Sequence, residues 1–520
     1  MRALSGLERK QLLRSARQRG VVIQAEALSV LTEIYSTLFS PNFGKFVETL
    51  FEYFQEVSDG SDILTEETSH KLFASLLRMS KREAGEIESR LTLIDAFQVP
   101  VPLFNRSSKA YGIDENAKPT LLSGPEEKIG MFRKRFELLL QRTLRDERFH
   151  LPETHDFVDT KVRLTEIESL HTQSGRKTVL GFLTQLEEGT WFLEDLRSSI
   201  QISIKNAQFT PGIHTDGSIV LAQGEVVGSL FVVDTLGSPS AEKRLDSLAA
   251  ISRCDLFGPA LEDADRKLLA EKETEDGEAM ILFLADVWLD TKQVLGGFKR
   301  LLQGFQESKI APAVIVLMGD FSSPQLSATE QAVNLQSNFG ALGNIIADYK
   351  EISEQTEFVI VPGPNDPGCM GVLPRESLAP FFVEEFRKYV KNVHLMSSPC
   401  RLRYYTQEIV VFREDLLQKM MRHSATRLTS EEDHTEHLVK SIVDQAHLCP
   451  LPLTSRPVLW EHDHALWLFP TPDVLVLACN QSPFVWSYNN CQAANPSRFG
   501  ENCTFTVYLP SSKIVQHSSC

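Results

Sequence analysis

The chain contains three long apolar runs, each followed by a turn with an acidic residue. The runs cover residues 281–285, 314–318 and 358–361, and the acids that follow them are Asp286, Asp320 and Asp366. Continuous apolar runs of this length are typical of strands buried on both faces. Segments with helical periodicity, 293–306 and 335–349, separate them, which predicts a layered α/β domain with a largely parallel sheet. Ligands of such sheets bind beyond the carboxyl ends of the strands, where we expect the three acids to lie.

The first 78 residues have a different pattern, with apolar residues at helical spacing. It predicts helices over 7–19, 26–39, 43–57 and 65–77, with Gly20 and Pro41 ending the first two. Residues 1–78 are therefore expected to form a small helical domain. A plain four-helix core and a tethered docking module both fit this pattern.

Residues 79–150 are predicted to be a linker that carries one charged amphipathic helix. Residues 105–124 are rich in Ser, Lys, Pro and Gly, which predicts a loop. Residues 128–148 have one apolar face and one basic face, the latter carrying Lys128, Arg133, Lys134, Arg135, Arg142 and Arg145. We expect the basic face to be solvated, with contact to an acidic partner as the alternative.

Strand-like periodicity takes over in residues 151–265. Short runs at 178–185, 190–194, 199–204, 219–226 and 230–236 are joined by tight turns. Five short strands of this kind predict a small barrel, for which the OB-fold is the natural candidate. OB-folds bind single strands through aromatic and basic residues. Because Glu187, Glu188, Glu194 and Asp195 surround the middle strands, we expect a structural barrel instead.

Composition limits the function classes. The chain has 520 residues, with 53 basic against 69 acidic residues and a net charge of −16. This length predicts about three or four domains. The apolar runs described above place the α/β domain in residues 266–520. We do not expect a chain with this negative charge to bind nucleic acid by itself, because neutralising the phosphates requires clustered Lys and Arg residues. No apolar run reaches about 18 residues, so no membrane span is expected. The eight cysteines include no Cys-x-x-Cys pair, which predicts reduced thiols.

The strand-end motifs resemble those of the calcineurin-like metallophosphoesterases, which use Asp-x-His, Gly-Asp-x-x-Asp and Gly-Asn-His-Asp/Glu. Two divalent metals need carboxylate, imidazole and amide ligands to hold a hydroxide against phosphate. Asp286, Asp320 and Asp366 are in place, but other positions have changed. Trp288 replaces the first His, Ser323 the bridging Asp, Pro364 the ligand Asn and Asn365 the catalytic His. We therefore expect a phosphoesterase fold without phosphoesterase chemistry: no catalytic residue, no metal and no cofactor.

Three histidines complete the candidate set. His447 resembles a remnant of the family's Gly-His-x-His metal motif, although a single His is more often a hydrogen-bonded core residue. His462 and His464 would share one face of a strand and could bind a metal there. We expect them to lie on the surface, away from the three acidic turns.

An OB-fold ahead of a degraded phosphoesterase domain resembles the B subunits of the replicative DNA polymerases, and the helical N-terminal segment narrows the resemblance to the epsilon type. The matching strings run in order along nearly the full length and include Lys128-Ile129-Gly130-Met131-Phe132-Arg133, Phe283-Leu284-Ala285-Asp286-Val287-Trp288, Val361-Pro362-Gly363-Pro364-Asn365-Asp366 and His447-Leu448-Cys449-Pro450-Leu451-Pro452. Ala478-Cys479-Asn480 departs from the family's Ala-Asp pair. The resemblance implies a multidomain α+β chain: a helical N-terminal domain, an OB-fold β-barrel and an inactive calcineurin-like α/β sandwich.

This resemblance also implies a non-catalytic nuclear subunit and its partners. The OB-fold and phosphoesterase domain would hold the C-terminal zinc-binding region of the catalytic subunit of DNA polymerase epsilon, in a complex with small histone-fold subunits. The N-terminal domain would resemble the lid of AAA+ ATPases and dock on the GINS component of the replicative helicase. DNA would be met only within that complex, and no membrane contact is implied.

Two rival functions remain open, namely an active metal-dependent phosphodiesterase or 3′-exonuclease, and a single-strand DNA-binding module acting through the OB-fold. It is also open why Asp286, Asp320 and Asp366 are present if the site binds no metal. Their carboxylates could accept backbone N–H bonds and cap the following helices, or they could bind a residual cation. We favour the first explanation, because capping needs no histidine ligands.

Overall fold

The chain forms two compact units, Met1–Arg90 and Leu91–Cys520. The computed structural model describes residues 4, 6–40, 42–57, 62–66, 68–73, 76, 90–149, 162–251, 255–258, 261, 263–368, 371–429 and 433–520. The predicted domain boundary at 78/79 lies outside these residues. Within the described ranges, no helix combines the length and apolar character needed to cross a membrane.

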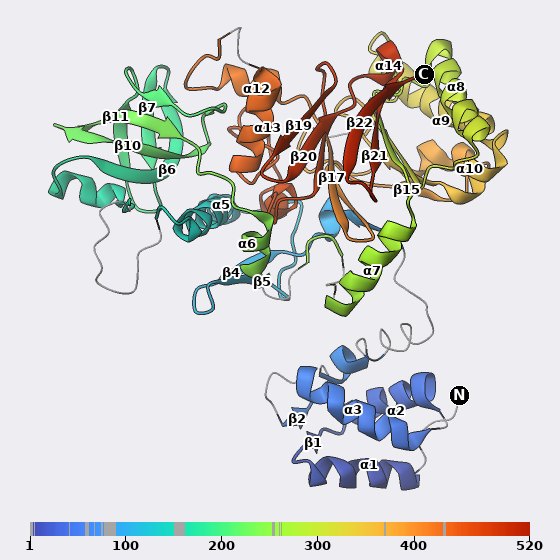
Figure 1. Ribbon diagram of the computed structural model, residues 1–520. Helices are drawn as coiled ribbons and strands as arrows, with labels where there is room; N and C mark the ends of the chain where they lie inside the picture. The colour runs from blue at the N-terminus through green and yellow to red at the C-terminus, as the bar shows by residue number, and fades with distance from the viewer. Residues whose placement is uncertain are drawn as a thin grey trace. The chain divides into compact units, whose positions relative to one another are not determined.

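The first unit is a small helical bundle (Figure 1). Its elements are α1 (Gly6–Gln18), α2 (Ala27–Ile34), a π-helical turn (Tyr35–Phe39) and α3 (Phe43–Val57). Helical residues also occur between 66 and 76, where Thr65 Oγ1 accepts the Thr68 amide at 3.1 Å. The first three predicted helices are confirmed. The pattern missed the parallel pairing of β1 (Val22–Ile23) with β2 (Ile63–Leu64).

The second unit contains a closed barrel. Its strands are β6 (Lys177–Glu187), β7 (Thr190–Glu194), β8 (Ser199–Ser203), β9 (Gln208–Phe209), β10 (Ile219–Val227) and β11 (Leu230–Gly237), with a 3-10 turn, η3, at Ile167–Thr172. They pair in the order β10-β6-β7-β8-β11-β9, and a further pairing of β10 with β11 closes the ring. The five predicted strands are all present, and Leu183, Leu193, Ile202 and Phe231 fill the interior.

The remainder of the second unit is built on two six-stranded sheets. The first has the order β15-β14-β13-β12-β21-β22, and the second β19-β20-β18-β17-β16-β3. The first sheet comprises β12 (Ile281–Ala285), β13 (Val314–Met318), β14 (Glu357–Val361), β15 (Val393–Leu395), β21 (Thr504–Leu509) and β22 (Ile514–Ser519). The second comprises β3 (Leu91–Asp95), β16 (Cys400–Tyr404), β17 (Gln407–Arg413), β18 (Val474–Ala478), β19 (Phe484–Tyr488) and β20 (Cys491–Asn495). As predicted, β12, β13 and β14 are parallel neighbours.

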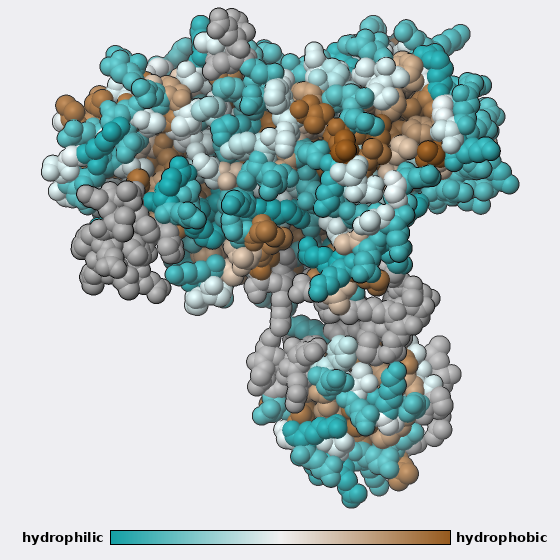
Figure 2. All heavy atoms as spheres, viewed as in Figure 1, coloured by the Kyte–Doolittle hydropathy of each residue, from teal (hydrophilic) through white to brown (hydrophobic). Residues whose placement is uncertain are grey.

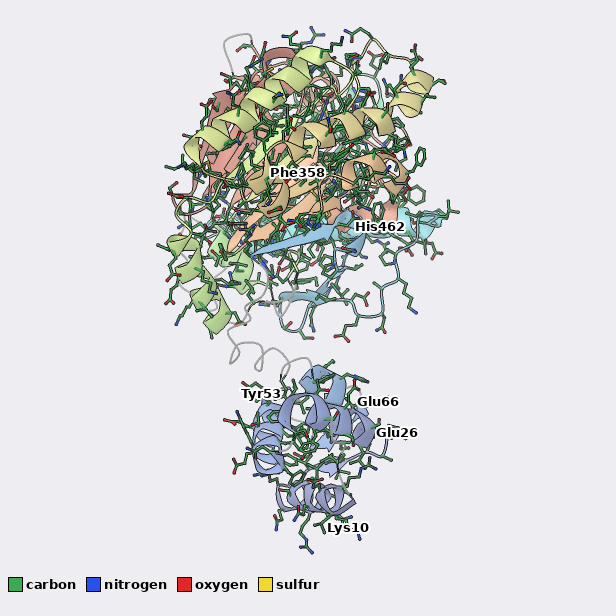
Figure 3. All side chains as sticks on the ribbon, turned by 90° about the vertical axis from the view of Figure 1, so that its right-hand side faces the viewer. Lys10, Glu26, Tyr53, Glu66, Phe358 and His462 are labelled. Carbon is green, nitrogen blue, oxygen red and sulfur yellow. The ribbon has the colours of Figure 1, made fainter. Side chains whose placement is uncertain are left out.

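Alternate residues of these strands face different layers. Phe283, Val316 and Val359 point between the sheets and meet Leu402, Val411 and Val476. Leu284, Leu317 and Phe358 point outward and pack against helices, as the position of Phe358 in Figure 3 illustrates. Val410 and Leu475 point outward from the second sheet. The result is a four-layer α/β/β/α sandwich, which explains why the strands read as continuously apolar.

Helices cover both outer faces of the sandwich. On the first sheet these are α8 (Lys292–Ser308), α9 (Ala328–Ala347), α10 (Lys350–Gln355), η4 (Pro380–Val383), α11 (Glu384–Arg387) and α14 (Phe499–Asn502). On the second sheet they are α12 (Leu417–Arg422) and α13 (His434–Asp444). Further helices are α6 (Arg244–Ala249), α7 (Asp263–Glu275) and the 3-10 helix η5 (Trp460–Leu466).

The prediction that residues 79–150 are a linker is wrong for the described part, 90–149. Leu91–Asp95 forms β3, which pairs antiparallel with β16 as the edge strand of the second sheet, followed by a 3-10 turn, η2 (Ala96–Gln98). The loop predicted over 105–124 contains β5 (Ala110–Ile113), which forms a hairpin with β4 (Pro102–Asn105). Helix α5 (Pro125–Arg145) packs Phe136 and Leu139 against Phe182 of the barrel and Trp467 of the sandwich. The sandwich therefore draws a strand from outside the predicted range 266–520.

Candidate functional site

Asp286, Asp320 and Asp366 meet at one edge of the first sheet, and their side chains tie its turns together. The Asp320 amide donates to Asp286 Oδ1 at 2.9 Å. The amides of Phe321 and Gly363 donate to the two oxygens of Asp366, each at 2.8 Å. Asn365 donates to Asp320 from its amide at 2.9 Å and from Nδ2 at 2.7 Å. The acids accept backbone N–H bonds, as expected, but from neighbouring turns. The prediction that they cap helices is wrong for α8 and α9, whose N-caps are Thr291 and Ser327.

Two glycines allow the turns to approach so closely. A Cβ on Gly319 would overlap the Asp366 carboxylate, and a Cβ on Gly363 would overlap that of Asp320. Asp286 itself has φ = 52°, in the left-handed region that Asp tolerates better than most residues. The Gly-Asp and Gly-Pro-Asn-Asp strings therefore have a structural reason that is independent of metal ligation.

Arg413 places a guanidinium against this carboxylate cluster. It is the last residue of β17 in the second sheet and is buried. Its Nε and Nη2 donate to Asp286 Oδ1 at 3.0 and 2.8 Å, and Nε also donates to Gly319 O at 2.8 Å. Its Nη2 lies 4.0 Å from Asp320 Oδ2, and its Nη1 lies 3.2 Å from Asp415 Oδ1. Arg498 adds a second cation, with Nε 3.2 Å from Asp286 Oδ2.

The charges of the site shift one another's pKa values. Burial raises the pKa of Asp286, and the neighbouring charge of Arg413 opposes that rise. Burial, and after it the charge of Asp320, raises the pKa of Asp366 to about 7. Burial disfavours the charged form of Arg413, but Asp286, Asp415 and Asp320 outweigh it and raise the pKa of Arg413 above its ordinary value. Arg413 is therefore a permanent cation in a cluster of acids.

The substituted motif positions also have structural contacts. The Ser323 amide and Oγ donate to the two oxygens of Asp290 at 2.8 and 2.6 Å. Trp288 packs against the outer helical core, where it leaves no space for a Cβ on Gly500. Pro364 is half-buried and Asn365 is exposed.

The residues present do not fit a pair of divalent metals. Indole and pyrrolidine offer no lone pair to a metal, and the oxygens of Asp286 already accept bonds from Arg413 and from a backbone amide. Over the described ranges, no group of three or more His, Cys, Asp or Glu side chains is arranged to hold a metal ion. The arrangement binds a guanidinium where the resemblance implies metals.

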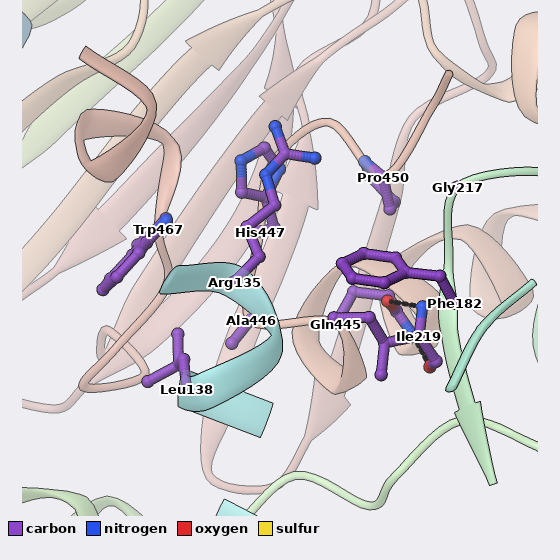
Figure 4. Close-up of a pocket in the computed structure, with 10 residues that line it drawn as sticks. All are labelled: Arg135, Leu138, Phe182, Gly217, Ile219, Gln445, Ala446, His447, Pro450 and Trp467. Carbon is purple, nitrogen blue, oxygen red and sulfur yellow. Dashed lines mark hydrogen bonds between the residues drawn. The ribbon is translucent and has the colours of Figure 1, made fainter. Parts of the chain in front are cut away.

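His447 has different partners from the three acids. Its Nδ1 accepts the Cys449 amide at 3.0 Å, so Nε2 carries the proton and donates to Asp463 Oδ1 at 3.2 Å. Burial and the charge of Arg135 lower the pKa of His447 and keep the ring neutral. It lines a cavity of about 10 Å³ with Arg135 and Trp467, which has space for about one water molecule (Figure 4). His447 is thus a hydrogen-bonded core residue, as expected.

The prediction that His462 and His464 lie on a surface strand is wrong. Both belong to η5, and both are buried together with Asp463. His464 Nε2 donates to Val99 O at 3.0 Å, and the His462 ring contacts that of Phe97 with centroids 4.9 Å apart (Figure 3 labels His462). The segment that contains Phe97 and Val99 covers this turn. The local sequence of residues 458–469 does not indicate this contact.

The prediction that the basic face of α5 is solvated is wrong for two of its six residues. Arg135 is buried and donates from Nε to Asp463 at 3.0 and 3.1 Å. Arg142 is buried and donates to the carbonyl oxygens of Pro239 and Asp444, the former at 2.9 Å. Sequence reasoning missed these roles and that of Arg413. The available signal was an Arg at the end of a buried strand, in Val410-Val411-Phe412-Arg413.

Comparisons with known proteins identify the class of protein to which the chain belongs. Residues 281–486 match the family model for the B subunit of DNA polymerases alpha and epsilon. Residues 125–240 match the model described as DNA polymerase epsilon subunit 2-like, OB-fold domain, which includes α5 with the barrel. The two-sheet sandwich and the barrel thus both belong to polymerase B-subunit domains.

Full-length relatives narrow the class further. The chain is 34% identical to the B subunit of DNA polymerase epsilon from Arabidopsis thaliana, over 98% of this chain and 99% of that protein. It is also 34% identical to DNA polymerase epsilon subunit 2 of Homo sapiens, over 98% of each. The chain belongs to the DNA polymerase epsilon subunit 2 family. Among solved structures, an archaeal phosphodiesterase aligns with 46% of this chain at 8% identity and a TM-score of 0.26.

Proposed function

We propose that this chain is the non-catalytic accessory subunit of DNA polymerase epsilon and acts in the nucleus as a scaffold of that complex. The observation that carries the proposal is the guanidinium of Arg413 within the carboxylate cluster, 2.8 Å from Asp286. A cluster whose oxygens bind a fixed cation has no open position for a metal-bound nucleophile. Membership of the epsilon family supports the same role.

The proposed partners follow from the family resemblance. The barrel and sandwich would hold the C-terminal zinc-binding region of the catalytic subunit, beside the small histone-fold subunits. The first unit, Met1–Arg90, would dock on the GINS component of the replicative helicase. The net charge of −16 supports protein partners over direct DNA binding, and Figure 2 shows a largely hydrophilic visible face with a few hydrophobic patches.

Co-expression tests the scaffold role. The full chain and the C-terminal region of a polymerase epsilon catalytic subunit should co-elute on size exclusion at 0.3 M salt, where weak surface ion pairs are screened. The C-terminal region of another polymerase's catalytic subunit is the matched control. Failure to co-elute, with both proteins folded, would contradict the proposal.

An activity assay tests the alternative of an active phosphoesterase. The purified chain should not hydrolyse a phosphodiester in the presence of Mn²⁺. Manganese-dependent hydrolysis that disappears in Asp320→Ala would show an active metal site and overturn the non-catalytic assignment. A fluorescence titration with single-stranded DNA tests the OB-fold alternative, and no binding is expected at 0.15 M salt.

A further inference from the structure

A groove lies beside α5, where this helix meets the β4–β5 hairpin and the barrel, in the left half of Figure 1. It consists of two hollows of about 560 and 220 Å³, which share Phe104, Arg106, Glu137 and Leu196 among their lining residues. Most of the apolar lining is aliphatic: Leu103, Leu140, Leu144, Leu164, Leu180 and Leu196. An apolar groove with a few polar groups is typical of a binding site.

The groove is also lined by exposed cations, namely Arg106, Lys109, Arg133 and Lys134. Arg133 and Lys134 belong to the basic face of α5. Over the described ranges, no ion pair involves any of these four side chains. A cluster of unpaired cations on a chain with a net charge of −16 favours an anionic partner at this place.

The acids of the groove have other partners. Glu137 accepts from Gln141 Nε2 at 2.8 Å, and Asp195 accepts the Arg197 amide at 2.8 Å. Glu166 lies 3.5 Å from the guanidinium of Arg197. These acids therefore leave the four cations available to an occupant of the groove.

Tyr111 provides a further unused polar group. It lines the groove and is 3% exposed, and its hydroxyl has no hydrogen-bond partner among the described residues. Burial, and after it the charge of Glu137, raises the pKa of Tyr111, so the hydroxyl keeps its proton. A buried donor without an acceptor costs free energy, which an acceptor on an occupant would recover.

The lining favours a peptide over a nucleic acid. Phe136 and Tyr111 are buried and Phe104 is half-buried, whereas single strands bind by stacking their bases on exposed rings. Glu137 and Asp195 would repel a continuous phosphate backbone. A peptide can place an apolar side chain in the groove and carboxylates only where the cations lie.

We infer that this groove binds an acidic peptide segment of a partner protein. An apolar side chain of the segment contacts the leucines, and its carboxylates pair with Arg106, Arg133 and Lys134. The inference does not rest on the proposed function, because binding is measured with this chain alone. Failure of the co-elution test would leave it intact.

Fluorescence anisotropy with the full chain tests the groove. The probe is the labelled peptide Asp-Glu-Asp-Leu-Phe-Asp-Glu-Asp, and the control peptide has Ser in place of Leu and Phe. The probe should bind with a dissociation constant of about 10 µM at low salt and more weakly at 0.3 M salt. The control peptide should bind at least about tenfold more weakly, because it buries no apolar side chain. Equal binding of both peptides, or binding of neither, would overturn the inference.

Charge reversal locates the binding. Arg106→Glu/Arg133→Glu places like charges opposite the probe and should weaken its binding at least about tenfold. Lys267→Glu/Lys299→Glu is the matched control, since it changes the net charge equally at exposed positions of α7 and α8. It should change the affinity by about twofold or less. Equal losses in both variants would indicate attraction by net charge and contradict a specific groove.

Other occupants would give different results. Tighter binding of a single-stranded oligothymidylate than of the probe, lost in Arg106→Glu/Arg133→Glu, would assign the groove to nucleic acid. Residues 150–161 also contain acids, Glu153, Asp156 and Asp159. If the probe binds only after Glu153→Gln/Asp156→Asn/Asp159→Asn, the occupant belongs to this chain. Either result would overturn the assignment of a partner protein.

Discussion

Arg135 on α5 and Asp463 in η5 form a buried ion pair between segments 328 residues apart in the sequence. Arg135 Nε lies 3.0 Å from Asp463 Oδ2, which also accepts from Trp467 Nε1 at 3.1 Å. Burial alone would raise the pKa of Asp463, but the charge of Arg135, together with the hydrogen bonds from His447 and Arg135, holds this pKa well below its usual range. The pair fixes α5, which packs on the barrel, to the sandwich.

Removal of one partner of this pair should be strongly destabilising. Arg135→Met leaves the Asp463 carboxylate buried without its guanidinium, which typically costs about 3–5 kcal/mol of unfolding free energy. Arg148→Met is the control, since Arg148 pairs with Asp146 at the exposed end of the same segment. The control should change stability by about 1 kcal/mol or less. Urea unfolding measures both, and equal losses would contradict the assigned role of Arg135.

His464 should make the chain sensitive to acid. Burial lowers the pKa of His464 from 6.5 to about 4, although its bond to Val99 O opposes the shift. Between these values the unfolded state binds a proton that the folded state excludes, so the free energy of unfolding falls as the pH falls. The expected loss from about pH 7 to about pH 5 is about 2 kcal/mol.

His464→Gln should remove that part of the pH dependence, because Gln does not titrate. His171→Gln, at an exposed position, is the control and should retain the wild-type pH profile. Urea midpoints measured at half-unit steps of pH provide the comparison. A wild-type slope in the His464→Gln variant would show that another group is responsible.

The apolar runs and the acids that follow them can be predicted from sequence because the information is local. A strand buried on both faces is apolar throughout, and parallel strands bring their carboxyl ends to one edge, so Asp286, Asp320 and Asp366 are expected together. The cation that neutralises them cannot be predicted in this way. Arg413 contacts Asp286 across 127 residues and across two sheets.

The segments that were predicted wrongly have no local sequence pattern that indicates their burial. Strand β3 is short and half-buried along its whole length, so it has neither an apolar run nor a clear alternation. The basic face of α5 has the periodicity of a solvated face, and periodicity does not indicate that Asp463 lies opposite Arg135. Buried polar side chains are predictable only when both partners of a pair are known.

Asp286→Asn should destabilise the chain more than Asp320→Asn does. The sequence alone predicts that both substitutions are mild, because an amide oxygen still accepts. Asp286 is the closest charge to a buried guanidinium, so its neutralisation should cost about 3–5 kcal/mol. Asp320 is less buried and accepts mainly from Asn365, so its loss should cost about 1 kcal/mol. Equal costs in thermal or urea unfolding would contradict this ranking.

The first unit should fold without the rest of the chain. Leu12, Leu31, Phe46, Leu50 and Leu72 are fully buried in its core, and the pairing of β1 with β2 connects the segments that follow α1 and α3. A protein of residues 1–90 should therefore show helical circular dichroism and one cooperative melting transition. Phe46→Ala should cost about 3–5 kcal/mol by leaving a cavity, whereas Leu7→Ala, at a position that is 70% exposed, should stay within about 0.5 kcal/mol. In limited proteolysis of the full chain, first cuts within residues 20–75 would contradict an independent fold.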